Sequence, residues 1–325
     1  MTPSLSQSEL LARHTVRWAE AVLWVFALAT YFLFPGYLAL ATLAVIMALF
    51  ALSLDVAMGF AGIVTLGHAI FFGLGAYCAG LLALAGFNEA ITGAAASGAL
   101  AALMAALIGP LILRLTGLPL LMVTLALGVI AYEAANKLTW LTGGDDGLQG
   151  IELKPLLGMF PFTVYGHTGY LYALSCLFVA FIATRRLLAS PFGVALQGIR
   201  ENRERMTLIG APVLGHLVRA YVISAFMAGV AGALSAQTTR FVGLAVFSLD
   251  NSADVMVMLV LGGIGRLYGG LIGAPIYVTI KDFAATWNPY HWMFVIGALL
   301  VVVVRFAQGG ILGMADLAIR AMMRR

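Results

Sequence analysis

The sequence predicts an all-α, polytopic membrane protein with about ten transmembrane helices. Of the 325 residues, 62% are hydrophobic and only 10% are charged, and the mean hydropathy is +1.01. A soluble domain of this length could not bury so much apolar surface in one core. The apolar residues also occur in stretches close to the roughly 20 residues that a membrane-spanning helix needs.

Ten such stretches follow one another along the chain, separated by proline, glycine or charged residues. They are residues 18–34, 37–53, 59–86, 91–113, 118–138, 168–184, 217–239, 253–265, 267–286 and 292–307. The third stretch is longer than one span requires, so we expect a break near 59–62 or near Gly67. Broken helices are tolerated in membranes where they line a cavity.

The basic residues predict the orientation of these spans. No small-residue cleavage site follows the first apolar stretch, which is therefore typical of a retained anchor with a cytoplasmic N-terminus. With ten spans, fourteen of the 18 Lys and Arg residues fall at cytoplasmic ends, as the positive-inside bias predicts. The other four fall near the outer side: Lys137, Lys154, Arg240 and Lys281.

The spans also predict how the chain is divided. Residues 1–17 and 309–325 are expected in the cytoplasm, and 18–308 form the transmembrane domain, with an outer loop over 139–167. The net charge of +4 does not indicate nucleic-acid binding, because the basic excess lies at membrane ends.

Glycines are concentrated in the third stretch and near the C-terminus. In "MGFAGIVTLGHAIFFGLGAYCAG" an unbroken helix would gather four of them on one face, and small residues let membrane helices approach closely. These four are Gly59, Gly62, Gly73 and Gly80. The later stretch "LGGIGRLYGGLIGAPIY" repeats the theme, which predicts a second packing stripe and hints at an internal duplication. Its glycines at four-residue spacing are Gly265, Gly269 and Gly273.

A few polar side chains fall within or beside the apolar stretches. His68 would either hydrogen-bond a neighbouring helix or face a translocation path. Asp55 is a functional candidate as an intramembrane carboxylate, or a solvated residue at a cytoplasmic helix end. Glu133 is expected to form an ion pair with Lys137, four residues later. A transporter driven by an ion gradient would depend on Asp55, Glu133 and Asp254.

A charged segment stands out between the sixth and seventh stretches. Ser190 and Pro191 favour a helix start and Gly210 a stop, which predicts one amphipathic helix over 191–209. Five charges fall within 200–205, and the spacing predicts the ion pairs Glu201–Arg205 and Arg200–Glu204. We interpret the segment as a cytoplasmic helix that meets a protein partner. A helix lying on lipid headgroups is the alternative.

The sequence contains none of the motifs that would indicate an enzyme. It has no GxxxxGK[ST] phosphate loop, and no Ser/His/Asp order, HExxH motif or Cys/His cluster. Asp145 and Asp146 make a poor metal cage without a third oxygen ligand, and a turn explains them better. Cys78 and Cys176 lie in apolar stretches and are interpreted as packing residues. We therefore expect no enzymatic activity, cofactor or metal in this chain.

Four parts of the chain match the motifs of one protein family. They are "GFAGIVTLGHAIFFGLGAY" (59–77), "LTGGDDGLQGI" (141–151), "SPFGVALQGIRENRERMTLIG" (190–210), and "VLGGIGRLYGGLIGAPIY" (260–277) followed by "FAQGGILGM" (306–314). In this order they resemble the LivM-like permease subunits of branched-chain amino acid ABC importers. The resemblance runs over most of the chain from Met58 onward.

The resemblance implies an importer-type ABC permease that works by alternating access in the bacterial inner membrane. The implied partners are two ATP-binding subunits, a second, LivH-like permease chain and a periplasmic substrate-binding protein, in addition to membrane lipid. The implied residues that couple ATP hydrolysis to the gate are Arg200, Glu201, Asn202, Arg203, Glu204 and Gly210. The implied substrate path follows Gly59, Gly62, Thr65, Gly67, His68, Phe72 and Gly73.

The chain departs from the family pattern at four positions. Val194 replaces a usual Arg, Arg203 a usual acid, Thr65 a Ser, and Asp55 an amide or apolar residue. The implied substrate is a branched-chain or other small amino acid, although a path with few charges would suit urea or a short amide nearly as well. An ion-coupled secondary transporter and a membrane scaffold without transport are the alternatives from other classes.

Overall fold

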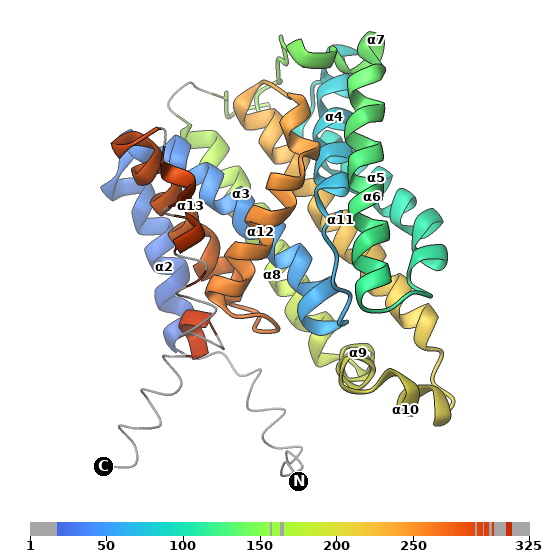
Figure 1. Ribbon diagram of the computed structural model, residues 1–325. Helices are drawn as coiled ribbons and strands as arrows, with labels where there is room; N and C mark the ends of the chain where they lie inside the picture. The colour runs from blue at the N-terminus through green and yellow to red at the C-terminus, as the bar shows by residue number, and fades with distance from the viewer. Residues whose placement is uncertain are drawn as a thin grey trace, which may run out of the picture.

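The protein is a bundle of helices joined by short turns (Figure 1). The structure is a computed structural model that describes residues 18–156, 158–162, 166–289, 291–294, 296–298, 301 and 310–313. Its α-helices are α2 (Trp18–Leu33), α3 (Leu38–Leu54), α4 (Ala69–Leu84), α5 (Ala90–Ile112), α6 (Leu118–Lys137), α7 (Thr139–Thr142), α8 (His167–Ala189), α9 (Pro191–Glu201), α10 (Arg203–Leu208), α11 (Val213–Thr239), α12 (Leu249–Gly262) and α13 (Gly269–Trp287). Short helical turns lie between them: η1 (Pro35–Tyr37), η2 (Asp55–Phe60), η3 (Gly144–Asp146) and η4 (Leu244–Phe247).

The predicted all-α, polytopic class is confirmed. Among the described residues, five segments are long and apolar enough to cross a membrane: Pro35–Phe60, α5, α6, α8 and α11. Val22–Leu33 and α4 are shorter apolar helices, and α12 and α13 pack along α3 in the same bundle. The predicted segment 1–17, most of the tenth stretch and most of the tail 309–325 lie outside the described residues.

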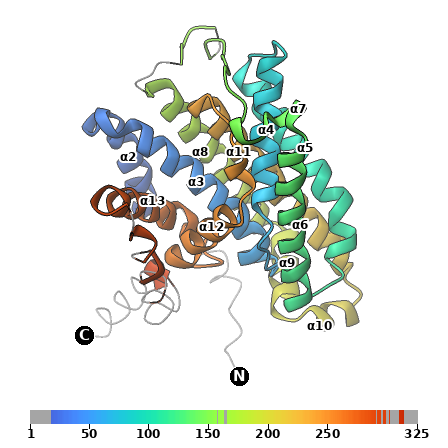
Figure 2. The same cartoon turned by 45° about the horizontal axis from the view of Figure 1, so that its top comes forward.

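The centre of the bundle is built from α3 and α11. Helix α11 packs along α4 and α5, and α3 packs against α8, α12 and α13. Figure 2 shows α2 and α13 on one flank and α5 and α6 on the opposite flank. Backbones approach closely in the centre, where a Cβ at Gly75 or Gly232 would overlap a carbonyl oxygen of the facing helix. Such contacts hold membrane helices together, since lipid tails leave no hydrophobic force between them.

The third predicted span is broken, as its length suggested. Helix α3 continues into the π-helical turn η2, and residues 61–68 then run without helical structure before α4 begins. Gly62 has φ +74, a left-handed conformation that interrupts the helix. The predicted stripe of four glycines is therefore wrong, because Gly59 and Gly62 precede the break and share no helical face with Gly73 and Gly80.

The glycine stripe near the C-terminus is also divided by a turn. Gly265 lies between α12 and α13, with φ +71, and is not part of a helix. Gly269 and Gly273 lie on α13 as predicted, where a Cβ would overlap the carbonyl oxygens of Gly263 and Met258. These two glycines therefore bring α13 against α12, whereas Gly265 has another role.

Candidate coupling site and substrate path

The charged segment 190–210, here called the coupling segment, forms two helices rather than the single helix predicted over 191–209. Helix α9 ends at Glu201, and the Asn202 side chain begins α10 by accepting a hydrogen bond from Arg205 N at 2.8 Å. The Ser190 hydroxyl donates to Leu187 O instead of capping α9. Gly210 ends α10 with φ +83, and the amides of Gly210 and Ala211 bond back to the last turn, as in a Schellman motif.

Two arginines of the coupling segment reach back into the bundle. Arg200 Nη1 donates to Gly59 O at the end of η2, and Arg203 Nη2 donates to Leu113 O, just after α5, at 2.6 Å. The predicted ion pairs Glu201–Arg205 and Arg200–Glu204 are not formed within the described residues 200–205, because the chain bends at Asn202 and no continuous helix aligns them.

The other side of the coupling segment is open. Glu201, Glu204 and Arg205 are exposed. Leu208 and Ile209 are 87% and 71% exposed, an unusual state for large apolar side chains outside the lipid-facing helices. The segment therefore presents a mixed charged and apolar surface at the end of the bundle opposite α7 (Figure 1).

Arg200 lies close to Asp55, Gly59 and Gly265, and we call these four residues the coupling corner. Asp55 is fully buried, and its Oδ1 accepts from Gly265 N at 2.7 Å. A Cβ at Gly59 would lie 2.7 Å from Gly265 N, and one at Gly265 would lie 2.5 Å from Arg200 Nη1. The expectation that Asp55 is solvated at a helix end is wrong, because η2 carries it under the α12–α13 turn.

A cavity of about 190 Å³ lies beside the coupling corner. Its walls include residues 61–64, the α5–α6 turn, and Ile199, Arg200 and Arg203 of the coupling segment. Residues 61–64 belong to the non-helical segment 61–68 between η2 and α4, here called the linker. Gly62 is exposed beside Arg200, and a Cβ at Gly62 would lie 3.2 Å from Arg200 Cγ. The coupling segment is therefore tied to the bundle in two ways: Leu196 and Ile199 of α9 are buried in the hydrophobic core, and Arg200 and Arg203 add hydrogen bonds beside the cavity.

The other candidate path residues are packed into the interior. His68 is fully buried, with Nε2 2.9 Å from Ser53 Oγ and its ring stacked on Phe50. The Thr65 hydroxyl accepts from Gly67 N at 3.1 Å. A Cβ at Gly67 would overlap Thr124 O of α6, and Phe72 and Gly73 pack on the rings of Phe50 and Phe247 respectively. In this conformation most of residues 65–73 are therefore buried by their neighbours.

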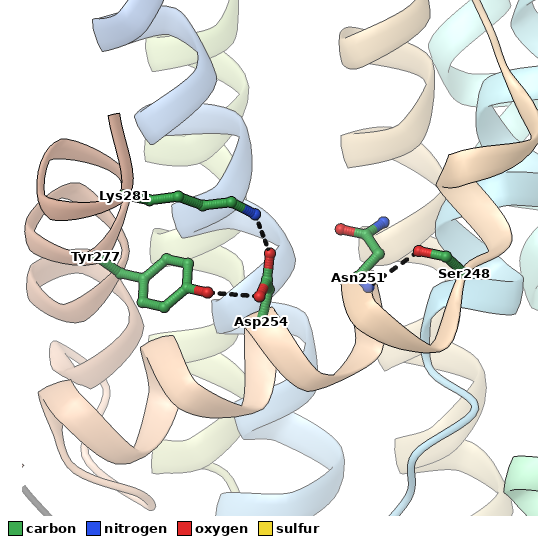
Figure 3. A network of polar contacts seen from close by, with 5 residues as sticks. All are labelled: Ser248, Asn251, Asp254, Tyr277 and Lys281. Carbon is green, nitrogen blue, oxygen red and sulfur yellow. Dashed lines mark hydrogen bonds and ion pairs between the residues drawn. The ribbon is translucent and has the colours of Figure 1, made fainter. Parts of the chain in front are cut away.

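Another polar network joins α12 to α13 (Figure 3). Lys281 Nζ lies 2.5 Å from Asp254 Oδ2, and the Tyr277 hydroxyl donates to Asp254 Oδ1 at 2.5 Å. Lys281 was expected near the outer side, but its inward ion pair with Asp254 was not predicted.

The remaining acidic candidates are exposed. Glu133 is exposed on α6, and the predicted ion pair with Lys137 is not formed between these two described residues. Asp145 and Asp146 are exposed in the turn η3. Within the described ranges no group of three or more His, Cys, Asp or Glu residues could hold a metal ion.

Residues 36–304 match the family model described as the permease component of branched-chain amino acid transport systems. The chain belongs to this family. It is 30% identical to the high-affinity branched-chain amino acid transport system permease protein LivM of Escherichia coli, over 90% of this chain and 73% of that protein. The LivM protein of Salmonella typhimurium is 29% identical over the same shares, and a probable LivM of Methanocaldococcus jannaschii is 29% identical over 42% of this chain and 39% of that protein. No solved structure gives a significant match.

The protein is thus a transport permease and not an enzyme. Sequence reasoning singled out the segment 190–210 as a candidate for coupling but did not predict that Arg200 and Arg203 bond the bundle. The break between α9 and α10 had a signal in the sequence, because Asn202 is a residue type that favours the start of a helix. The contact of Asp55 with Gly265 joins residues 210 positions apart and left no local signal.

Proposed function

We propose that this permease imports branched-chain amino acids by alternating access, driven by two ATP-binding subunits that dock on the coupling segment. A second, LivH-like permease chain and a periplasmic binding protein complete the importer. The membrane is the bacterial inner membrane, with the coupling segment and both termini on the cytoplasmic side. The relatives named LivM support the substrate class, and the distribution of basic residues supports the orientation.

The two-sidedness of the coupling segment is the observation that carries this proposal. Arg200 and Arg203 hydrogen-bond the bundle, whereas Glu201, Glu204 and Leu208 face outward. A surface of exposed charges and apolar side chains suits a protein partner, with the charges fixing the register. The inward arginines would pass the motion of that partner to the membrane helices.

The coupling corner gives this motion a route. A displacement of α9 moves Arg200, which holds Gly59 O at the end of the broken helix. Gly59 and Asp55 contact Gly265, so the α12–α13 turn must follow. The cavity between the linker and α9 leaves room for the displacement. Packed helices switch between discrete arrangements, so the linker 61–68 and α4 would open the path on one side and close it on the other.

The path would include the candidates Gly59, Gly62, Thr65, Gly67, His68, Phe72 and Gly73. All except Gly62 are buried in this conformation, which suits a closed state of the path. The glycines allow the linker to lie against α6 and the α12–α13 turn without side chains that would block its movement.

Two other hypotheses find less support. An ion-coupled transporter would require its carboxylates to exchange ions with water, but Asp55 is sealed in the coupling corner. Asp254 already has a cation, Lys281. A coupling segment that only rests on lipid would suit the exposed Leu208 and Ile209. It would not require Arg200 and Arg203 to be fastened to η2 and α5.

Native mass spectrometry of the chain, purified gently from its host membrane, tests the proposal. Wild type should carry two ATPase chains and a second permease chain. The variant Glu201→Ala/Glu204→Ala/Leu208→Ala should lose the ATPases, while Arg200→Leu should keep them and lose uptake. Gln149→Ala, an exposed change in the outer loop, is the matched control. A wild-type chain that is purified without any ATPase would contradict the proposal.

A further inference from the structure

The ion pair between Asp254 and Lys281 joins α12 to α13 and is accessible. Lys281 is six residues before the end of α13, so the pair lies about 9 Å along the helix from that end. The exposed fractions of the two side chains are 38% for Lys281 and 22% for Asp254. Charged side chains at such positions are costly and usually face the bundle interior or a water-filled path.

Stability does not explain the pair. Replacing a buried ion pair with apolar residues is often neutral or stabilising, because the loss of hydration offsets the attraction between the charges. Gly269 and Gly273 already bring α12 and α13 together through close backbone contacts. The two helices therefore do not need opposite charges to associate.

The network is built so that each member of the pair has a second partner. The fully buried Tyr277 holds the second oxygen of Asp254 through its hydroxyl. Lys281 Nζ lies 5.2 Å from the centre of the Trp292 ring and 5.9 Å from that of Tyr277, distances at which an aromatic face attracts an ammonium group. Asn251, one turn earlier on α12, bonds Ser248 and Val246 and leaves the pair to Tyr277 and the aromatic rings (Figure 3). Either charge can therefore release the other and remain oriented.

We propose that Asp254 and Lys281 form a zwitterion subsite of the substrate path. Asp254 accepts the α-ammonium group of an amino acid in place of the Lys281 ammonium, and Lys281 binds the α-carboxylate. Without substrate the two side chains neutralise each other, and with substrate two ion pairs replace one. The inference rests on the proposed function and narrows its substrate class. Urea and neutral amides are disfavoured, because they can only hydrogen-bond the two separated charges and supply no countercharge to replace the broken ion pair.

Uptake of radiolabelled L-leucine into right-side-out vesicles of the host membrane, with ATP enclosed and the binding protein supplied outside, tests this subsite. The informative variant is the double change Asp254→Asn/Lys281→Met, which removes both charges and leaves no unpaired ion. It should insert at the wild-type level and still lose about 10- to 100-fold in uptake rate, the effect of a missing charged hydrogen bond. The conservative variant Asp254→Glu/Lys281→Arg should retain measurable uptake. Asp250→Asn, an exposed acid one turn earlier on α12, should leave uptake unchanged.

If the double variant transports leucine like wild type, the ion pair is not a substrate subsite and the inference is wrong. If wild type accumulates urea or isovaleramide as well as leucine, the requirement for a zwitterion is also wrong. Wild-type vesicles that take up no leucine with ATP would instead contradict the proposed function itself.

Discussion

The permease contains two acidic side chains that meet neighbouring helices in very different surroundings. Asp55, in the coupling corner, is fully buried and contacts the backbone of Gly265. Asp254, in the zwitterion subsite, is 22% exposed and contacts the flexible side chain of Lys281. A buried carboxylate that bonds a backbone amide holds two segments of the chain together, whereas an accessible carboxylate that bonds a side-chain ammonium group can exchange that group for a ligand. Changes at the corner should therefore reduce stability and coupling, and changes at the pair should reduce recognition.

The largest loss of stability should follow from filling the coupling corner. Gly59→Ala places a Cβ that would overlap Asp55 Oδ1 and lie 2.7 Å from Gly265 N, and overpacking of this kind costs about 1–3 kcal/mol or more. Gly215→Ala is the matched control, because nothing lies within 4 Å of a Cβ at that position on α11. Thermal unfolding in detergent should show a lower midpoint for Gly59→Ala only. Equal midpoints for the two variants would mean that the corner is not tightly packed.

Removing the Asp55 acceptor from the coupling corner should reduce stability less, and an asparagine at the same position should recover part of the loss. Asp55→Ala leaves the partly buried N–H of Gly265 without its partner, at a cost near the lower end of the usual range, about 1 kcal/mol. Asp55→Asn retains a side-chain oxygen for the same amide and should recover most of that loss. The free energy of unfolding of both variants, measured under the same conditions, checks this. If Ala and Asn are equally unstable, the charge of Asp55 matters more than its hydrogen bond.

The smallest effect on stability should come from the open pair. Asp254→Asn/Lys281→Met removes both charges together, and such replacements are often neutral or stabilising. We expect the unfolding midpoint to stay at or above that of wild type while leucine uptake falls. A midpoint that drops as far as in Gly59→Ala would remove the contrast between the two regions.

Hydropathy predicted most of the bundle, because membrane spans must be long and apolar, whereas the glycine stripes assumed helices that are broken by turns. The stretch 118–138 corresponds closely to α6, and 91–113 to α5. The break over 61–68 was suggested only by excess length, since its residues are as apolar as those of a helix. Charge spacing failed in the coupling segment because it assumes one continuous helix, and Asn202 starts a second one.

The two polar sites could not be predicted as contacts from the sequence. Each depends on the turn between α12 and α13, which folds α13 back on α12 and brings Lys281 to Asp254. The same turn presents Gly265 to Asp55 on a distant part of the chain. Sequence reasoning identified both acids as intramembrane candidates. Only the helix packing showed that Asp55 is buried against the turn and that Asp254 is accessible.

The central claim is that Arg200 carries motion from the coupling segment to the far end of the bundle. The most direct test is the distance between two spin labels, attached to cysteines that replace Trp140 and Trp287, both 80% exposed. The native Cys78 and Cys176 are first replaced by serine so that they are not labelled. In the intact importer this distance should shift when ATP is trapped on the ATPases. It should stay constant in Arg200→Leu, although the ATPases remain bound. An equal shift in wild type and Arg200→Leu would contradict the account.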